Sequence, residues 1–161
     1  MLYILNLTLQ GRREEKNKKI QLSNTMLQTL YREETTRSCG ELLNYSWTDM
    51  QDFLSKYDST VNPESFAKRM SVFNIFESLG YLLRNGLIDM ELIYVNGGMT
   101  SISLWAKFKP VMEEYRKIAY GSDMFSNFEY FAEEMWKIKR ARDPSFLRDQ
   151  TLGIDFLKIF G

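Results

Sequence analysis

The absence of histidine limits the chemistry that this sequence can perform. Its 161 residues contain no histidine and a single cysteine, Cys39. Histidine is the commonest general base, the usual partner of serine and cysteine nucleophiles, and a frequent ligand of zinc and iron. Cys39 has neither a histidine nor a second cysteine as a partner, so we interpret it as an inert thiol. A lone cysteine also favours a reducing compartment, the cytoplasm.

Carboxylates are the remaining groups that could hold a cation. Two acids three residues apart share one face of a helix, and helical magnesium-dependent hydrolases use such pairs on facing helices. Asp49 and Asp52 have this spacing, but no second pair stands on another expected helix. The adjacent acids at 113–114 and at 133–134 point apart, which is typical of solvated helix faces. We therefore expect no metal site and no cofactor.

Among the acids of the sequence, Glu77 is the one most clearly expected to have a specific partner. It lies at the edge of the apolar face of an expected helix, with Tyr81 and Arg84 on the same side one and two turns later. A carboxylate at the boundary of a core usually accepts from a hydroxyl or pairs with a cation. We expect Tyr81 to donate to Glu77 in a polar clasp between helices. The alternative is that Glu77 lines a ligand pocket.

Apolar residues recur at helical spacing along most of the chain. A first helix is expected from about residue 20, with fraying around 35–40, and a second after an N-cap at Ser46. The clearest helix start is Asn62-Pro63-Glu64, because asparagine caps a helix and proline fits its first turn. This helix, residues 62–85, ends before Gly86 and has an apolar face wide enough for the centre of a bundle.

Three further helices are expected in the second half of the chain. They are a short helix from Asp89 to a turn at Asn96-Gly97-Gly98, a helix over about 100–120 that Pro110 kinks, and a helix over 126–142 that a capping box at Ser126 opens. The sequence thus predicts an all-α fold, a single irregular bundle of five to six helices. Residues 20–144 form this helical domain.

The N-terminal segment, residues 1–19, is apolar at first and then basic. Residues 1–9 are mostly apolar and 12–19 carry five cations, the order found at the cytoplasmic edge of a membrane anchor. Crossing a bilayer takes about 20 apolar residues, more than this segment has. We expect a lead-in that packs on the domain. The alternative is the remnant of an anchor, which would place the N-terminus on the inner membrane surface.

The C-terminal tail, residues 145–161, is rich in bulky apolar side chains. Those proposed to form an interface are Phe146, Leu147, Phe156, Leu157 and Phe160. Water does not accommodate such a cluster well, so the tail is expected to dock. It docks either on its own domain or on a neighbouring chain, and the second case would produce a homo-oligomer.

Three segments resemble a known family. They are VFNIFESLGYLLRNGLIDMELIYVNGG (72–98), LWAKFKPVMEEYRK (104–117) and NFEYFAEEMWKIKR (127–140). They are similar to a prokaryotic family of helical domains of unknown function, DUF4760, whose members share F-E-x-(I/L)-G-x-L-(I/L), G-L-I-D, W-x-K-x-x-P-x-(I/M) and E-Y-(F/L)-A-E segments. The resemblance implies a helical fold and, because members often begin with a membrane helix, a place near a membrane. It implies no activity and no catalytic residue.

Composition favours an interaction role over catalysis. Lysine plus arginine and aspartate plus glutamate both number 21, and without a basic surplus nucleic-acid binding is the least favoured function. We predict a non-enzymatic helical interaction module in the cytoplasm, with membrane proximity and self-association as further hypotheses. The alternative is a magnesium-dependent enzyme or a small-ligand binder that uses Glu77 and neighbouring acids.

Overall fold

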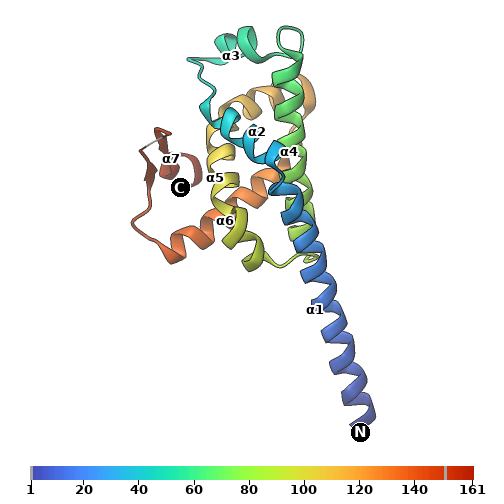
Figure 1. The fold of residues 1–161 in the computed structure, drawn as a ribbon. Coiled ribbons are helices and arrows are strands. Elements are labelled where there is room, and N and C mark those ends of the chain that lie inside the picture. Colours follow the sequence, from blue (N-terminus) through green and yellow to red (C-terminus); the bar gives the residue numbers. More distant parts are fainter. Residues whose placement is uncertain (1, 151) are drawn as a thin grey trace.

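The computed structural model describes residues 2–150 and 152–161, without the side chains of residues 2–7, 119 and 120. Its helices are α1 (Leu2–Leu30), α2 (Glu33–Asn44), α3 (Met50–Tyr57), α4 (Pro63–Arg84), α5 (Met90–Tyr115), the π-helix η1 (Arg116–Tyr120), α6 (Ser126–Arg142) and α7 (Phe156–Phe160). Two short antiparallel strands, β1 (Arg148–Asp149) and β2 (Ile154–Asp155), precede α7. Figure 1 shows the arrangement. The all-α fold class is confirmed.

The core lies where α6 packs on both α4 and α5. Aromatic rings fill it: Phe76 of α4 stacks on Phe128 of α6 with centroids 5.0 Å apart, and Trp105 of α5 meets Phe128 edge-on at 5.1 Å. Phe73 of α4 meets Phe108 of α5 at 5.2 Å. Such ring pairs add to the stabilisation from buried apolar area. The expected central position of helix 62–85 is confirmed by these contacts.

Helix α4 begins and ends as its sequence predicts. The Asn62 side chain accepts a hydrogen bond from the Ser65 N–H at 3.0 Å, and Pro63 occupies the first turn. After the helix, Gly86 adopts a φ of 65°, a left-handed conformation that glycine tolerates best.

Two expectations for the first half of the chain are wrong. The segment around 35–40 is not frayed but lies inside α2, because Cys39 and Leu42 bury one face of that helix. Ser46 does not cap α3; the Asp49 carboxylate does, accepting from the Asp52 N–H at 2.9 Å. Asp52 in turn accepts from the Thr48 N–H at 3.0 Å, so the two acids serve the start of the helix.

The expected turn at Asn96-Gly97-Gly98 is also wrong, because α5 runs through it. A Cβ atom on Gly97 would lie 3.2 Å from Leu30 of α1, and one on Gly98 would lie 2.8 Å from the Tyr94 ring, one turn earlier in α5. Gly97 therefore lets α1 approach α5 closely, and Gly98 makes room for the Tyr94 ring. The expected helix start at Asp89 is correct, and the Asp89 carboxylate caps the helix by accepting from the Leu92 N–H at 2.8 Å.

Helix α5 also continues through Pro110 and ends at Tyr115, where η1 follows. The seven α-helices of the described chain differ from the five to six expected for three reasons. Helix α2 is additional, the two helices expected on either side of 96–98 are one, and the tail contributes α7.

Among the side chains of α1 that the structure describes, those that pack on the domain lie in its C-terminal half, and Figure 1 shows the helix extending away from the others. Ser23 and Leu27 are buried, whereas residues 8–18 are all exposed. For residues 8–18 the expected packing of the lead-in on the domain is therefore wrong. Within the described part of the chain, no helix is both long enough and apolar enough to cross a bilayer.

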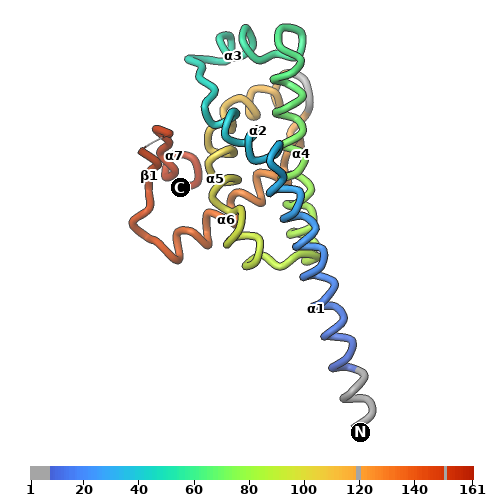
Figure 2. The backbone as a smooth tube through the Cα atoms, viewed as in Figure 1, coloured from blue at the N-terminus to red at the C-terminus, as the bar shows by residue number. Residues whose placement is uncertain are grey.

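The tail folds back beside α5, as Figure 2 shows. The ring of Phe156 is fully buried, 5.4 Å from Trp136 of α6, and Phe160 stacks on the same indole at 5.5 Å. Phe146 stacks on Phe156 at 5.4 Å. Leu147 and Leu157 remain 36% and 44% exposed. The five tail residues thus divide into three rings that pack on the domain and two leucines that face solvent.

We expect Phe156→Ala to lower the free energy of unfolding by about 3 kcal/mol, since it leaves a cavity against Trp136. The neighbouring change Leu157→Ala serves as the control and should cost about 1 kcal/mol or less, because Leu157 is exposed. Urea unfolding followed by circular dichroism measures both. Equal effects of the two substitutions would contradict the observed burial.

Candidate functional site

Glu77 caps a helix other than its own. One carboxylate oxygen accepts from the Phe128 N–H at 2.7 Å, and the other accepts from the Asn127 side-chain amide at 2.8 Å. Phe128 lies in the first turn of α6, where backbone N–H groups have no acceptor within the helix. The carboxylate also complements the positive end of the α6 dipole. Glu77 thus joins α4 to the start of α6.

Helix α6 needs this external cap because its own sequence provides none. The expected capping box of Ser126 and Glu129 is wrong. Ser126 is the first helical residue, and the N-cap position is taken by Phe125, in a left-handed conformation with a φ of 54°. Glu129 instead pairs with Arg116, with an N–O distance of 2.7 Å.

Gly80, one turn after Glu77, allows the two helices to meet. A Cβ atom at this position would lie 1.9 Å from the carbonyl oxygen of Asn127, far closer than atoms can approach. The backbone of α4 therefore touches the first turn of α6 directly, and only glycine fits. This contact holds the Glu77 carboxylate within reach of the N–H groups.

The other two residues of the predicted cluster have different positions. Arg84 lies over the Tyr130 ring, 4.5 Å from its centroid, and donates to the carbonyl oxygen of Ser126 at 3.4 Å. Tyr81 is 57% exposed and, in the described chain, has no hydrogen bond to Glu77. Glu77 and Arg84 thus both contact α6. The groups that donate to Glu77 belong to α6, and Tyr81 is not one of them.

The surroundings of Glu77 do not form an acidic pocket. The shallow hollow beside it is lined by Ser78, Tyr81, Leu82 and Asn127, so Glu77 is its one carboxylate. Over the residues that the structure describes, no three acids or cysteines gather closely enough to hold a metal ion.

Burial raises the pKa of the Cys39 thiol to about 11. A thiol with such a pKa remains protonated at neutral pH and is a poor nucleophile. The chemistry of Cys39 is thus that of the inert thiol predicted from the sequence.

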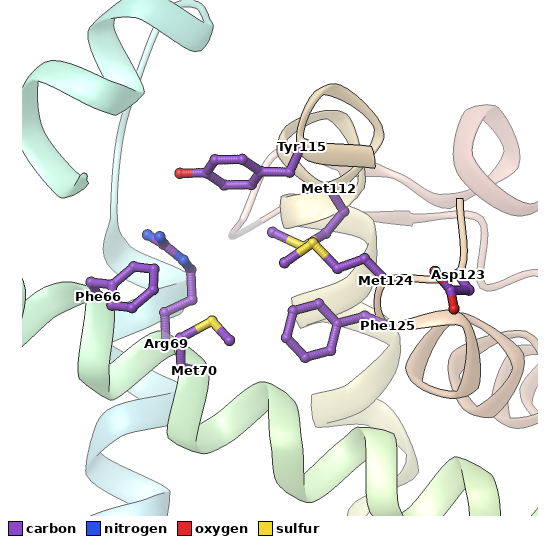
Figure 3. Close-up of a pocket in the computed structure, with 8 residues that line it drawn as sticks. All are labelled: Phe66, Arg69, Met70, Met112, Tyr115, Asp123, Met124 and Phe125. Atoms are coloured by element: carbon purple, nitrogen blue, oxygen red, sulfur yellow. The ribbon is translucent and has the colours of Figure 1, made fainter. Parts of the chain in front are cut away.

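An apolar cavity lies elsewhere, between α4, α5 and the loop that precedes α6, and sequence reasoning missed it. It measures about 340 Å³. Figure 3 shows its lining residues: Phe66, Arg69, Met70, Met112, Tyr115, Asp123, Met124 and Phe125. Arg69, Met112, Tyr115 and Phe125 are buried, while Asp123 is exposed. The cavity therefore has a buried floor and an open rim.

Arg69 is the polar group of this floor, and its side chain is only 1% exposed. Its Nη1 donates to the carbonyl oxygen of Tyr57 at 3.3 Å, and its guanidinium carbon lies 4.8 Å from the centroid of the Phe53 ring. Its Nη2 has no hydrogen-bond partner among the described residues. Burial lowers the pKa of the Arg69 guanidinium, and the nearby Tyr115 opposes this effect.

The loop of residues 121–125 forms the opposite wall and is held in place by Arg116. Its Nε donates to the carbonyl oxygen of Met124 at 2.9 Å, while Nη1 bonds to Glu129 at 2.7 Å. The guanidinium lies over the Trp105 ring, 5.5 Å from the centroid. One arginine therefore links η1, the cavity wall and α6.

The sequence does contain a signal for this site. Arg69 stands between Phe66 and Phe73, three residues before it and four after it, so a cation interrupts the apolar face of α4. An arginine in such a position is buried unless it can reach solvent, and it then needs partners. Met112 and Phe125, which complete the cavity, come from distant segments whose approach no local pattern indicates.

We expect Glu77→Ala to lower the free energy of unfolding by about 1–3 kcal/mol, because two donors at the start of α6 lose their acceptor. The adjacent substitution Ser78→Ala is the control, since Ser78 is exposed. Hydrogen exchange should locate the loss: amides in the first turn of α6 should exchange faster in the Glu77 variant alone. Unchanged exchange there would exclude the capping role.

Gly80→Ala should destabilise the fold by about 3 kcal/mol or more, because the new methyl group would overlap the backbone of α6. Gly40→Ala is the matched control. Gly40 lies in α2 with no atom within 4 Å of the added carbon. There the substitution should stabilise by about 0.5–1 kcal/mol through helix propensity. Thermal unfolding of both variants tests whether the two changes in stability have opposite signs. Changes of the same sign would contradict the close contact at Gly80.

Comparison with known proteins identifies a family for the chain. The family model described as domain of unknown function (DUF4760) matches residues 2–136. The matched range contains Glu77, Gly80 and the whole lining of the cavity, and it ends within α6. No curated protein and no solved structure shows significant similarity to the chain. The matched range covers most of the sequence, and the chain belongs to the DUF4760 family of domains of unknown function.

Proposed function

We propose that this chain is a non-enzymatic helical interaction module that works at a membrane surface and reaches that surface through α1. The observation that carries the proposal is the exposure of residues 8–18, which extend α1 beyond the domain. Short helices without tertiary contacts are only marginally stable in water. A projecting helix of this kind is therefore expected to find a partner.

The composition of the projecting segment favours a charged surface over another helix. Within residues 8–18 the one bulky aliphatic side chain is Leu9, which is 46% exposed. Helices that pair with each other need an apolar stripe that recurs at every turn. This segment has none, so pairing with a second copy of α1 over residues 8–18 is disfavoured.

The charges of the segment suit an anionic bilayer. Residues 12–19 contain five cations and two acids, and Lys19 pairs with Glu15 at an N–O distance of 3.6 Å. Basic residues near an anionic membrane surface each contribute about 1 kcal/mol of attraction. The sequence before them is apolar, and apolar side chains can insert at the headgroup boundary.

The rest of the domain supports binding over catalysis. The carboxylate of Glu77 is occupied by the α6 cap, and Asp49 is occupied by the α3 cap. Acids that satisfy helix ends are not available to hold a cation or to move a proton. These two carboxylates therefore serve the structure of the domain.

We expect the full chain to float with vesicles that contain phosphatidylserine, and not with vesicles of phosphatidylcholine alone. Reversing three cations of α1, with Arg12→Glu, Arg13→Glu and Lys16→Glu, should abolish flotation because the attraction becomes repulsion. Added salt should weaken the binding of the unaltered chain.

The control reverses three exposed cations outside α1, with Lys117→Glu, Lys137→Glu and Arg148→Glu. It changes the net charge by the same amount and should still float. The proposal fails if the full chain ignores anionic vesicles, or if this control loses binding as completely as the α1 variant does.

A further inference from the structure

The Arg69 guanidinium carries a donor that has no acceptor in the part of the chain that the structure describes. Nη2 is buried and has no hydrogen-bond partner there, whereas Nη1 donates to Tyr57, the group lies over the Phe53 ring and the Tyr115 side chain interacts with it. Asp58 is an acid whose charge acts on Arg69, but its carboxylate accepts a hydrogen bond from the Thr60 N–H at 2.9 Å. A buried charged donor without an acceptor is costly, so an acceptor at this position would be bound favourably.

The space in front of Arg69 is apolar and large enough for a small molecule. Its volume of about 340 Å³ lies in the range of ligand pockets, roughly 300–1,000 Å³. Three methionines, Met70, Met112 and Met124, line it together with phenylalanines. Methionine side chains are flexible and polarisable, so they can adapt to the shape of an apolar ligand.

The two charged residues of the cavity lie at different places. Figure 3 shows Arg69 beside Phe66 and Tyr115, and Asp123 on the far side of the Met112 and Met124 side chains. Arg69 is buried, whereas Asp123 is exposed at the rim. A ligand with one negative group would place it at Arg69, and a second negative group at the outer end would meet Asp123.

From these observations we propose that the cavity binds a small apolar monocarboxylate, with its carboxylate on Arg69 and its apolar body against the three methionines. A carboxylate fits a guanidinium through charge-assisted hydrogen bonds. The apolar wall contributes by removing the ligand body from water. Asp123 selects against dicarboxylates of similar length.

Three probes of equal chain length separate the contributions. Octanoate has the carboxylate and the apolar body, octanamide lacks the charge, and suberate carries a second carboxylate. We expect octanoate to bind about 10- to 100-fold more tightly than octanamide, because only octanoate makes a charge-assisted bond to Arg69. Suberate should also bind more weakly than octanoate.

Methyl spectra of methionine-labelled protein report where the probes bind. The chain has nine methionines, and the resonances of Met70, Met112 and Met124 should shift with octanoate. Met50 and Met99 do not line the cavity and should not shift. Shifts spread evenly over all methionines would indicate nonspecific association and would overturn the proposal.

Arg69→Met keeps an unbranched apolar side chain and removes the charge, so octanoate affinity should fall to that of octanamide. Lys68→Met is the matched control. The Lys68→Met substitution removes the same charge from the adjacent position. Because Lys68 pairs with Glu41 outside the cavity, octanoate affinity should remain unchanged. Equal losses in both variants would contradict a direct bond to Arg69.

Two further variants keep the test decisive if Arg69→Met does not fold. Met70→Trp fills the cavity from its partly exposed wall and should abolish octanoate binding while the helical content remains unchanged. Asp123→Asn should bring suberate affinity close to that of octanoate. If octanoate does not bind the unaltered chain at millimolar concentration, or if octanamide binds equally well, Arg69 has a structural role alone and the proposal is wrong.

Discussion

The contact between α4 and the first turn of α6 determines how the other parts of the domain are placed. Gly80 lets the backbones touch, and Glu77 supplies the acceptors that α6 lacks. The stack of Phe76 on Phe128 continues the same contact into the core. The F-E-x-L-G segment, prominent in the family resemblance, is therefore structural: its ring, carboxylate and glycine together place α6.

The position of α6 determines the two regions beside it. At its C-terminal half, Trp136 receives Phe156 and Phe160 of the tail. At its start, the left-handed residue Phe125 both precedes the helix and lines the cavity. Arg116 reinforces this corner, because it bonds to the loop and to Glu129 of α6. The cavity wall is thus built from the residues that directly precede α6.

Local sequence was most informative where a helix end depends on a few neighbouring residues. Asn62 and Asp89 cap their helices as their sequences predict, because the capping bond joins residues three apart. The same reasoning failed at Ser126, whose helix is capped by Glu77, 49 positions earlier in the chain. It also failed at Gly97 and Gly98, where glycine makes room for Leu30 of α1 and for the Tyr94 ring and does not form a turn.

The sequence by itself determined that the chain is helical, that the helix at 62–85 is central, and that histidine-based chemistry is excluded. These properties follow from spacing and composition, which are local. Only the tertiary structure decided that Glu77 serves α6 instead of pairing with Tyr81, and that Arg69 lies at the floor of a cavity. Both depend on which distant segments come into contact. The close packing of helices determines those contacts, and no single segment of the sequence specifies it.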